Sequence, residues 1–139
     1  MRVLFIDFDG VMHPLNKGKT FTNTHLLWDI LRRIPDIQVV ISSSWREHYA
    51  FERMVGLLTR EGGEDLSHRI VGVTPQTANT SRGQECSQWI INSNTQDAQW
   101  LAIDDDPNLF KGFEDRLICT NPRLGLTEQD VEKVIDYNL

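Results

Sequence analysis

Short apolar runs alternate with amphipathic segments along the chain, and no other feature constrains the fold as much. The apolar runs have the size of single strands and cover residues 2–8, 37–41, 69–73, 99–103 and 116–119. Helical spacing of apolar residues predicts helices from Asn23 or Thr24 to Arg33, from about Tyr49 to Arg60, from Arg82 to Asn92, and from Thr127 onward. Such alternation is typical of a parallel sheet with helices on both faces. We therefore expect an α/β three-layer sandwich with a mainly parallel central sheet.

Chain length and helix-start signals fit one domain. A chain of 139 residues has the size of a single domain, and it contains no repeat, low-complexity tract or linker, so we expect one domain over 1–139. Asn23 or Thr24 can cap the first helix. Thr127 and Asp130 have the spacing of a capping box at the start of the last helix.

Composition narrows the function classes. The formal net charge is −6, which argues against tight generic binding of duplex nucleic acid but not against handling one terminal phosphate. Cys86 and Cys119 lie in apolar segments, and we expect reduced core thiols in a cytoplasmic protein. No apolar run approaches the ~20 residues of a membrane-spanning helix, so we expect no membrane partner. The opening MRVLFIDFDG predicts a buried strand, not a signal peptide.

Polar and mostly acidic residues stand at the ends of three predicted strands. Asp7 and Asp9 end the first strand, Ser42 ends the second, and Asp104 and Asp105 end the fourth. In open parallel sheets, ligands bind beyond the carboxyl ends of the strands. The sequence therefore predicts a functional site at this edge of the sheet.

The pair Asp7 and Asp9 suits phosphoryl transfer. Residues two apart in a strand point to the same side, so both carboxylates can share a pocket while Phe8 faces the core. Gly10 then lets the backbone turn and approach a ligand closely. Repulsion should raise one pKa of the pair, so that one carboxylate attacks while the other holds a proton. Carboxylate oxygens and water favour Mg²⁺ as the cation.

An isolated Asp-x-Asp pair also fits other interpretations, including solvated carboxylates and glycosyltransferase sites. A calcium loop does not fit, because Gly10 arrives too early and Gly18 stands where a bidentate Glu belongs. A response-regulator receiver would need an acceptor Asp after the third strand, where Thr74 and Pro75 stand.

The motifs together resemble the haloacid dehalogenase (HAD) superfamily. IDFDGV resembles its first motif, VVISSS its second and WLAIDDD its acidic fourth motif. ISSSWR, the Arg82-x-x-Glu85-x-x-x-Trp89 helix and GLTEQDVEKVI are similar to the short HAD domains of Swiss Army knife RNA repair proteins. The resemblance implies a Rossmann-like, capless phosphohydrolase that depends on Mg²⁺. In that family, Asp7 would attack phosphorus and bind the metal. Asp9 would be the general acid/base and bind the metal through its carbonyl.

The resemblance also assigns the phosphate-binding groups. The Ser42 hydroxyl and the Ser43 backbone N–H would bind the phosphoryl group beside the Gly10 turn. Arg46 would either reach a substrate phosphate or stand solvated at a helix start. Asp105 would be a metal ligand. Asp104 would be a further metal residue and would steady the basic residue of the third motif.

Two assignments remain open at this point. Asp106 takes the part of Asp104 or Asp105 if the strand ends one residue later. The third motif usually carries a Lys, which is missing from TSRGQE, and Arg82 is the natural substitute. A guanidinium binds phosphate bidentately but is not interchangeable with an ammonium. A cation at a helix start is unfavourable without a nearby anion, which favours a functional Arg82 over a surface one.

Four further residues near the motifs have two interpretations each. Trp45 can stack on a base or lie in the core or rim, and we favour the core or rim. His13 can line the pocket or be an ordinary loop residue, which we favour. Lys17 and Lys19 can form a basic flap or a solvated loop, which we also favour.

The short connections suggest the substrate. About a dozen residues follow Asp9 before the first helix, and a similar number separates Val73 from Arg82, so neither gap holds a lid domain. Capless family members tend to act on large substrates, so RNA or DNA ends are natural candidates. We therefore expect a phosphomonoesterase for a nucleic-acid or nucleotide terminal phosphate. The alternatives are a small-metabolite phosphatase and a non-catalytic phosphate-binding module.

Overall fold

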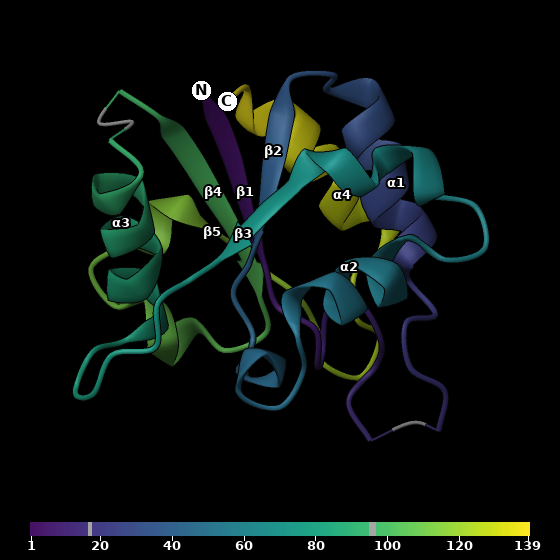
Figure 1. Cartoon of the computed structure of the whole chain (residues 1–139), viewed down its shortest axis with the longest axis horizontal. Helices are drawn as coiled ribbons and strands as arrows, with labels where there is room; N and C mark the ends of the chain where they lie inside the picture. Colours follow the sequence, from purple (N-terminus) through teal and green to yellow (C-terminus); the bar gives the residue numbers. More distant parts are fainter. Residues whose placement is uncertain (17, 95–96) are drawn as a thin grey trace.

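The computed structural model describes residues 1–16, 18–94 and 97–139, and it confirms the predicted parallel sheet. Five strands pair in the order β3-β2-β1-β4-β5, and every pairing is parallel (Figure 1). The strands are β1 (Arg2–Ile6), β2 (Ile37–Ile41), β3 (Ile70–Val73), β4 (Gln99–Asp104) and β5 (Leu117–Cys119). The fold is therefore the expected Rossmann-like α/β sandwich.

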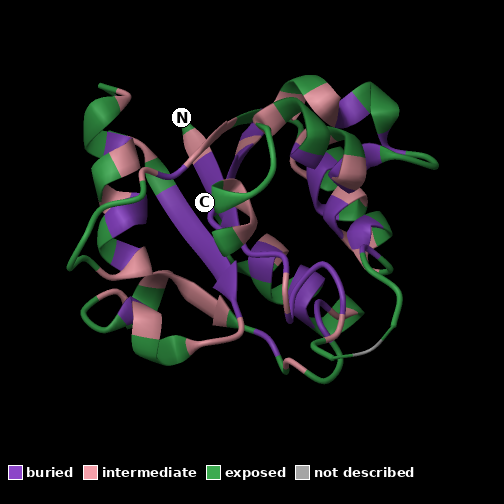
Figure 2. Cartoon of the chain, turned by 60° about the horizontal axis from the view of Figure 1, so that its bottom comes forward, coloured by how far each residue is buried: buried purple, intermediate pink, exposed green. Residues whose placement is uncertain are grey.

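Helices cover both faces of this sheet. They are α1 (Thr24–Arg33), α2 (Phe51–Thr59), α3 (Arg82–Asn92) and α4 (Glu128–Tyr137). Figure 1 shows α3 on one side of the sheet and α1, α2 and α4 on the other. Central strand β1 serves both cores, since Leu4 and Ile6 join the α1 side while Val3 and Phe5 join the α3 side. Figure 2 shows the central strands buried over most of their length, with more exposed residues where they begin.

The loops after β1 and β3 leave the strand ends open. Residues 74–81, and the described part of 10–23, contain no helix and no strand. The expectation that neither connection holds a lid domain is confirmed for these residues.

Short 3₁₀ helices account for most differences from the prediction. Tyr49 does not lie in α2, because the single turn η1 (Ser44–Glu47) precedes that helix. Three more such turns were not predicted, namely η2 (Glu64–Arg69), η3 (Pro107–Phe110) and η4 (Glu114–Arg116). A single 3₁₀ turn is too short to show a hydrophobic period, so periodicity does not reveal it.

The predicted caps had different outcomes. The capping box of α4 is confirmed, since the Asp130 N–H donates to Thr127 Oγ1 at 3.3 Å and the Thr127 N–H donates to Asp130 Oδ2 at 3.0 Å. Side-chain capping of α1 by Asn23 is wrong. The Asn23 amide instead donates to the carbonyls of Leu124 and Leu126, at 2.9 and 3.0 Å, and so ties the start of α1 to the loop before α4.

The two cysteines are both free, but only one is a core thiol. Cys86 is buried under the sheet, whereas Cys119 is exposed at the end of edge strand β5, so its predicted core position is wrong. In the described parts of the chain, no helix is long and apolar enough to cross a bilayer.

Arg69 joins α1 to the start of β2. Its guanidinium donates to three backbone carbonyls, at 2.9 Å to Ile37, 3.1 Å to Leu31 and 2.6 Å to Ile34. The carbonyls at the end of a helix lack helical partners, and a cation there is favoured by the helix dipole.

Replacing Arg69 by Met should therefore lower the free energy of unfolding by about 2–4 kcal/mol, because three carbonyls lose a charged donor. Urea unfolding followed by circular dichroism measures the change. Arg53→Met is the control and should stay within about 0.5 kcal/mol, since Arg53 is exposed over the Tyr49 ring and forms no ion pair with a described residue. Equal stability of the two variants would contradict a structural role of Arg69.

Candidate active site

Neighbouring strands β1 and β4 bring three aspartates together. Asp7 follows β1, Asp104 ends β4 and Asp105 follows it, and the two strands pair through Ile6 and Ile103. Carboxylate oxygens of the three aspartates lie within 4.8 Å of one another. Asp7 and Asp104 are buried. The convergence expected from the sequence is therefore present.

Gly10 makes room for Asp105. Its φ is +78°, and a Cβ built on it would lie 2.5 Å from Asp105 Oδ2. The Gly10 carbonyl also accepts the Thr120 hydroxyl at 2.7 Å, which anchors the turn to the end of β5. A glycine is thus required here both by its backbone conformation and by the carboxylate of Asp105.

Arg82 supplies the cation of this cluster from the first turn of α3. Its Nη1 lies 2.9 Å from Asp104 Oδ2 and 3.3 Å from Asp7 Oδ2. The helix start is fixed by a capping box between Ser81 and Gln84, which the sequence analysis did not identify. Arg82 therefore stands where the missing third-motif Lys would be needed.

The three consecutive aspartates have separate contacts. Asp104 accepts Arg82 with one oxygen and the Asp106 N–H, at 3.0 Å, with the other. Asp106 accepts the Asn108 N–H at 3.0 Å and caps η3. Asp105 belongs to the carboxylate cluster, whereas Asp106 does not. β4 ends at Asp104, one residue beyond the predicted end at position 103, yet Asp105 and not Asp106 joins the cluster and is the better candidate ligand.

Burial makes ionisation of the cluster's carboxyl groups unfavourable. Burial raises the pKa of Asp7 well above its ordinary value, and the nearby Asp104 raises it further, although Arg82 opposes both. Burial also raises the pKa of Asp104 to about 6. Since one pKa unit corresponds to about 1.4 kcal/mol, holding Asp104 ionised at neutral pH costs on the order of 3 kcal/mol. The sequence analysis attributed a raised pKa to the pair Asp7 and Asp9, whereas the structure attributes it to Asp7 and Asp104.

The donor set fits a hard divalent cation. Three converging carboxylates carry three negative charges, and one guanidinium compensates only one of them. A divalent cation would balance the remainder, and Mg²⁺ prefers carboxylate oxygens. Asp7 and Asp105 are the residues placed to hold it, because Asp104 is engaged by Arg82.

Asp9 stands outside this cluster in an environment of its own. β1 ends at Ile6, so Asp9 is not in the extended strand that the sequence analysis assumed. One carboxylate oxygen lies 2.8 Å from His13 Nε2, and the other accepts the Trp45 Nε1–H at 3.1 Å. The carboxylate is therefore held by two nitrogens from two different loops.

His13 has a defined tautomer. It is 4% exposed, and its Nδ1 accepts the Phe21 N–H at 3.1 Å. The ring proton must then be on Nε2, where it is donated to Asp9. The favoured interpretation of His13 as an ordinary loop residue is wrong. The four-residue spacing between Asp9 and His13 was the only signal of this contact in the sequence. The sequence does not show that His13 is buried beside Phe21, and this burial makes the spacing informative.

Trp45 packs against the core and also contacts the candidate site. Its ring packs partly buried against the core next to Phe8 and Phe21, which agrees with the favoured core or rim position. Its N–H nevertheless holds Asp9. Tyr49 stacks on the Trp45 ring with a centroid separation of 5.0 Å, so that face does not receive a base.

Ser42 and Ser43 follow β2, directly beside the end of β1. The Ser42 N–H donates to the Ile6 carbonyl at 2.8 Å, and its hydroxyl lies 3.7 Å from Cys86 Sγ. Burial raises the pKa of the Cys86 thiol to about 12, so Cys86 is an inert neighbour. The Ser43 hydroxyl accepts the backbone N–H of Trp45 at 3.2 Å. Both serines are buried at the same edge of the sheet as Asp7.

Arg46 pairs with a carboxylate outside the cluster. The Arg46 guanidinium bonds both Glu85 oxygens, at 3.0 and 3.1 Å, and the Ser43 carbonyl at 3.1 Å. This nearly buried ion pair ties the serine turn to α3 and engages both terminal nitrogens of Arg46, while its buried Nε has no hydrogen-bond partner among the described residues. Lys19 is exposed, and Lys17 lies outside the described residues.

Replacing Asp7 by Asn should stabilise the metal-free protein at neutral pH. The folded state holds the protons of Asp7 and Asp104 to higher pH than the unfolded chain does, so folding stability falls as pH rises from about 4 through these raised pKa values. Removing one buried charge should raise Tm at pH 7 by roughly 3–8 °C, or about 1–2 kcal/mol. Thermal unfolding in a chelator measures the change.

Asp106→Asn is the matched control for this measurement. An Asn at that position keeps a side-chain oxygen for the Asn108 N–H, and Tm should change by less than about 2 °C. At pH 4 the gain from Asp7→Asn should vanish. A gain of the same size at both pH values would show that charge is not its cause.

Comparison with known protein families gives a match over most of the chain. A family model described as the HAD domain in Swiss Army Knife RNA repair proteins matches residues 3–131. A search of curated proteins returned no match. The matched region runs from β1 into α4 and includes every residue of the carboxylate cluster, Arg82 and both serines. The chain therefore belongs to the HAD-type hydrolases, in the family described as the HAD domain in Swiss Army Knife RNA repair proteins.

Proposed function

We propose that the domain of residues 1–139 is a phosphomonoesterase that works through an aspartyl-phosphate on Asp7. The observation that carries this proposal is the convergence of Asp7, Asp104 and Asp105 within 4.8 Å, with Arg82 beside two of them. A buried carboxylate next to a fixed guanidinium is suited to attack a phosphate, whose own charge the guanidinium offsets.

The proposed reaction has two steps. An Asp7 oxygen attacks phosphorus, the bond to the leaving oxygen breaks, and Asp9 gives that oxygen a proton. Asp9 then takes a proton from a water molecule that attacks the phosphorus of the aspartyl-phosphate. Inorganic phosphate leaves, and the Asp7 carboxylate is restored. Both oxygens of Asp9 are oriented by N–H groups, which suits a residue that must meet first a leaving group and then water.

Mg²⁺ is the proposed cofactor, held by Asp7, Asp105 and the backbone carbonyl of Asp9. When bound, it supplies positive charge that keeps the nucleophile ionised and offsets charge on the phosphoryl oxygens. The raised pKa of metal-free Asp7 supports this requirement, because a protonated carboxyl group is a poor nucleophile.

The phosphoryl group would be bound by the Ser42 hydroxyl, the Ser43 N–H and Arg82, with the Gly10 turn beside it. Arg46 is left out of this proposal because Glu85 engages it. Its role is to hold the serine turn against α3.

The proposed substrate is a terminal phosphate of RNA, DNA or a nucleotide. The described residues of the two loops above the strand ends carry no lid, so a large substrate can reach the site. The family is described from RNA repair proteins, which supports the same class. We place the activity in the cytoplasm, because both cysteines are unpaired thiols.

The function is tested by phosphate release. With Mg²⁺, the wild-type protein should release phosphate from a generic aryl phosphate, and Asp7→Asn should lower kcat by at least about 10³-fold, because it removes the nucleophile. Asp106→Asn is the control and should keep nearly full activity, since its carboxylate caps η3. Chelation of the metal should abolish release by the wild-type protein.

Three outcomes separate the alternatives. Faster turnover of phosphorylated oligonucleotides than of sugar phosphates supports the proposed substrate class, whereas the reverse favours a small-metabolite phosphatase. No release with any divalent metal would favour a non-catalytic phosphate-binding module.

His13 should matter most for poor leaving groups. His13→Ala removes one donor from Asp9 and should lower kcat/KM for an alkyl phosphate by about 10²-fold, because its leaving oxygen needs the proton. An aryl phosphate with a good leaving group should lose less than about threefold. Initial rates on the two substrates measure this difference.

His13→Gln and Trp45→Phe sharpen this comparison. The first can place an amide N–H near the position of Nε2, and it should restore part of the alkyl phosphate activity. The second keeps an aromatic ring but loses the other donor to Asp9, and it should show the same leaving-group dependence. An equal loss on both substrates would leave His13 with a purely structural role.

A further inference from the structure

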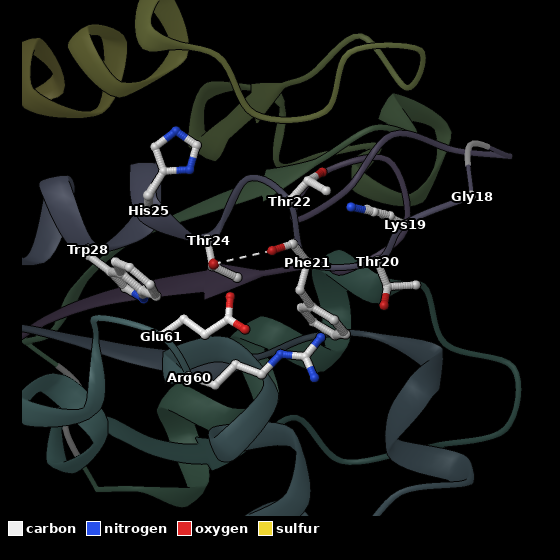
Figure 3. Close-up of a pocket in the computed structure, with 10 residues that line it drawn as sticks. All are labelled: Gly18, Lys19, Thr20, Phe21, Thr22, Thr24, His25, Trp28, Arg60 and Glu61. Carbon is white, nitrogen blue, oxygen red and sulfur yellow. Dashed lines mark hydrogen bonds between the residues drawn. The ribbon is translucent and has the colours of Figure 1, made fainter.

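A large cavity lies beside the site, between three segments of the chain. Its volume is about 690 Å³, and its walls are the loop 18–22, the first turns of α1 and the end of α2 (Figure 3). The residues that line it are mostly polar: Gly18, Lys19, Thr20, Phe21, Thr22, Thr24, His25, Trp28, Arg60 and Glu61.

The large cavity shares part of its wall with a hollow at the proposed general acid. This second hollow of about 360 Å³ is lined by Asp9, His13 and the loop that follows, and it shares Gly18 and Thr20 with the large cavity. Asp9 must face the leaving oxygen if it is to protonate it. The large cavity therefore adjoins the hollow on the leaving-group side of the proposed reaction.

Two cations that line the cavity have no charged partner among the residues that the structure describes. Lys19 and Arg60 form no ion pair and no side-chain hydrogen bond within the described residues. In this acidic chain, the arginines at positions 2, 32, 33, 46 and 82 all pair with carboxylates. Figure 3 shows Arg60 reaching toward the Phe21 ring from the end of α2, and Lys19 on the loop beyond it. Glu61 is the one carboxylate of the lining.

The walls of the cavity hold unusual backbone conformations. Phe21 has φ of +58° and Glu61 has φ of +69°, in the left-handed region that bulky residues rarely adopt. Such conformations persist where the surroundings impose them, and they concentrate at functional sites. Phe21 also donates its N–H to His13, so this wall is bonded to the residue that orients Asp9.

We propose that this cavity binds a second phosphate, carried by the leaving group of the substrate. The inference rests on the proposed function, because the first phosphate is the one transferred to Asp7. Lys19 and Arg60 supply the positive charge, and the Thr20 hydroxyl can donate a hydrogen bond to the anion. The preferred substrates are then phosphomonoesters whose leaving group is itself phosphorylated.

Turnover of four substrates tests this assignment. The substrates are an aryl phosphate, a nucleoside monophosphate, a nucleoside 3′,5′-bisphosphate and a trinucleotide with one terminal phosphate. Lys19→Gln and Arg60→Gln should each lower kcat/KM for the last two by about 5- to 10-fold, and leave the first two within about twofold. A bisphosphate-only effect points to a second monoester phosphate, and a trinucleotide-only effect points to a phosphodiester.

Two variants serve as controls. Glu61→Gln removes the carboxylate of the cavity and should raise kcat/KM for the two-phosphate substrates by about two- to fivefold. Lys111→Gln removes an exposed cation outside the cavity and should change nothing. Equal losses on all four substrates, or no loss on any, would overturn the proposal.

A binding measurement separates this proposal from the proposed function. A labelled, terminally phosphorylated trinucleotide is titrated into Asp7→Asn protein, and fluorescence anisotropy gives Kd without turnover. Adding Lys19→Gln or Arg60→Gln should raise Kd by about 5- to 10-fold. If wild-type protein releases no phosphate but this difference remains, the cavity assignment stands while the phosphomonoesterase assignment fails. If Kd does not change, the cavity assignment fails.

Discussion

The shared guanidinium of Arg82 is the contact on which the site depends. Parallel pairing of β1 and β4 forces Asp7 and Asp104 together at the end of the sheet, where burial removes the water that would otherwise solvate both charges. One nitrogen of Arg82 lies within 3.3 Å of both carboxylates. Because it compensates only one charge, the cluster keeps an excess of negative charge that suits the proposed cation. The architecture and the proposed cofactor site thus depend on the same two strands.

The aspartates of the first motif have different surroundings, and this difference divides their chemistry. Asp7 lies in a buried cluster, where burial and Asp104 raise its pKa and Arg82 opposes them. Asp9 is half exposed and is held by N–H donors from His13 and Trp45. These surroundings suit the proposed roles, because a nucleophile needs a fixed charge, whereas a proton carrier must exchange with solvent and substrate. Phe8 separates the two by turning into the core between them.

Much of this could be predicted from the sequence, because strand runs and helix periods are local signals. The predicted strand ends place Asp7, Ser42 and Asp105 at one edge of the sheet. Only the order of the strands in the sheet had to be known in addition to bring these residues together. What could not be predicted depends on side chains meeting across loops. The contact of His13 with Asp9 depends on the burial of His13 beside Phe21. Arg46 pairs with Glu85, 39 residues further along the chain, and not with the predicted phosphate. Neither contact has a period or a spacing rule.

The close approach of Gly10 to Asp105 links the turn after β1 to the carboxylate cluster. A single added methyl group at position 10 would lie 2.5 Å from the Asp105 carboxylate, and the φ of +78° would be strained for any residue with a side chain. A substitution here would therefore disturb both the turn and the position of Asp105. The local backbone and the proposed cation site thus depend on the same glycine.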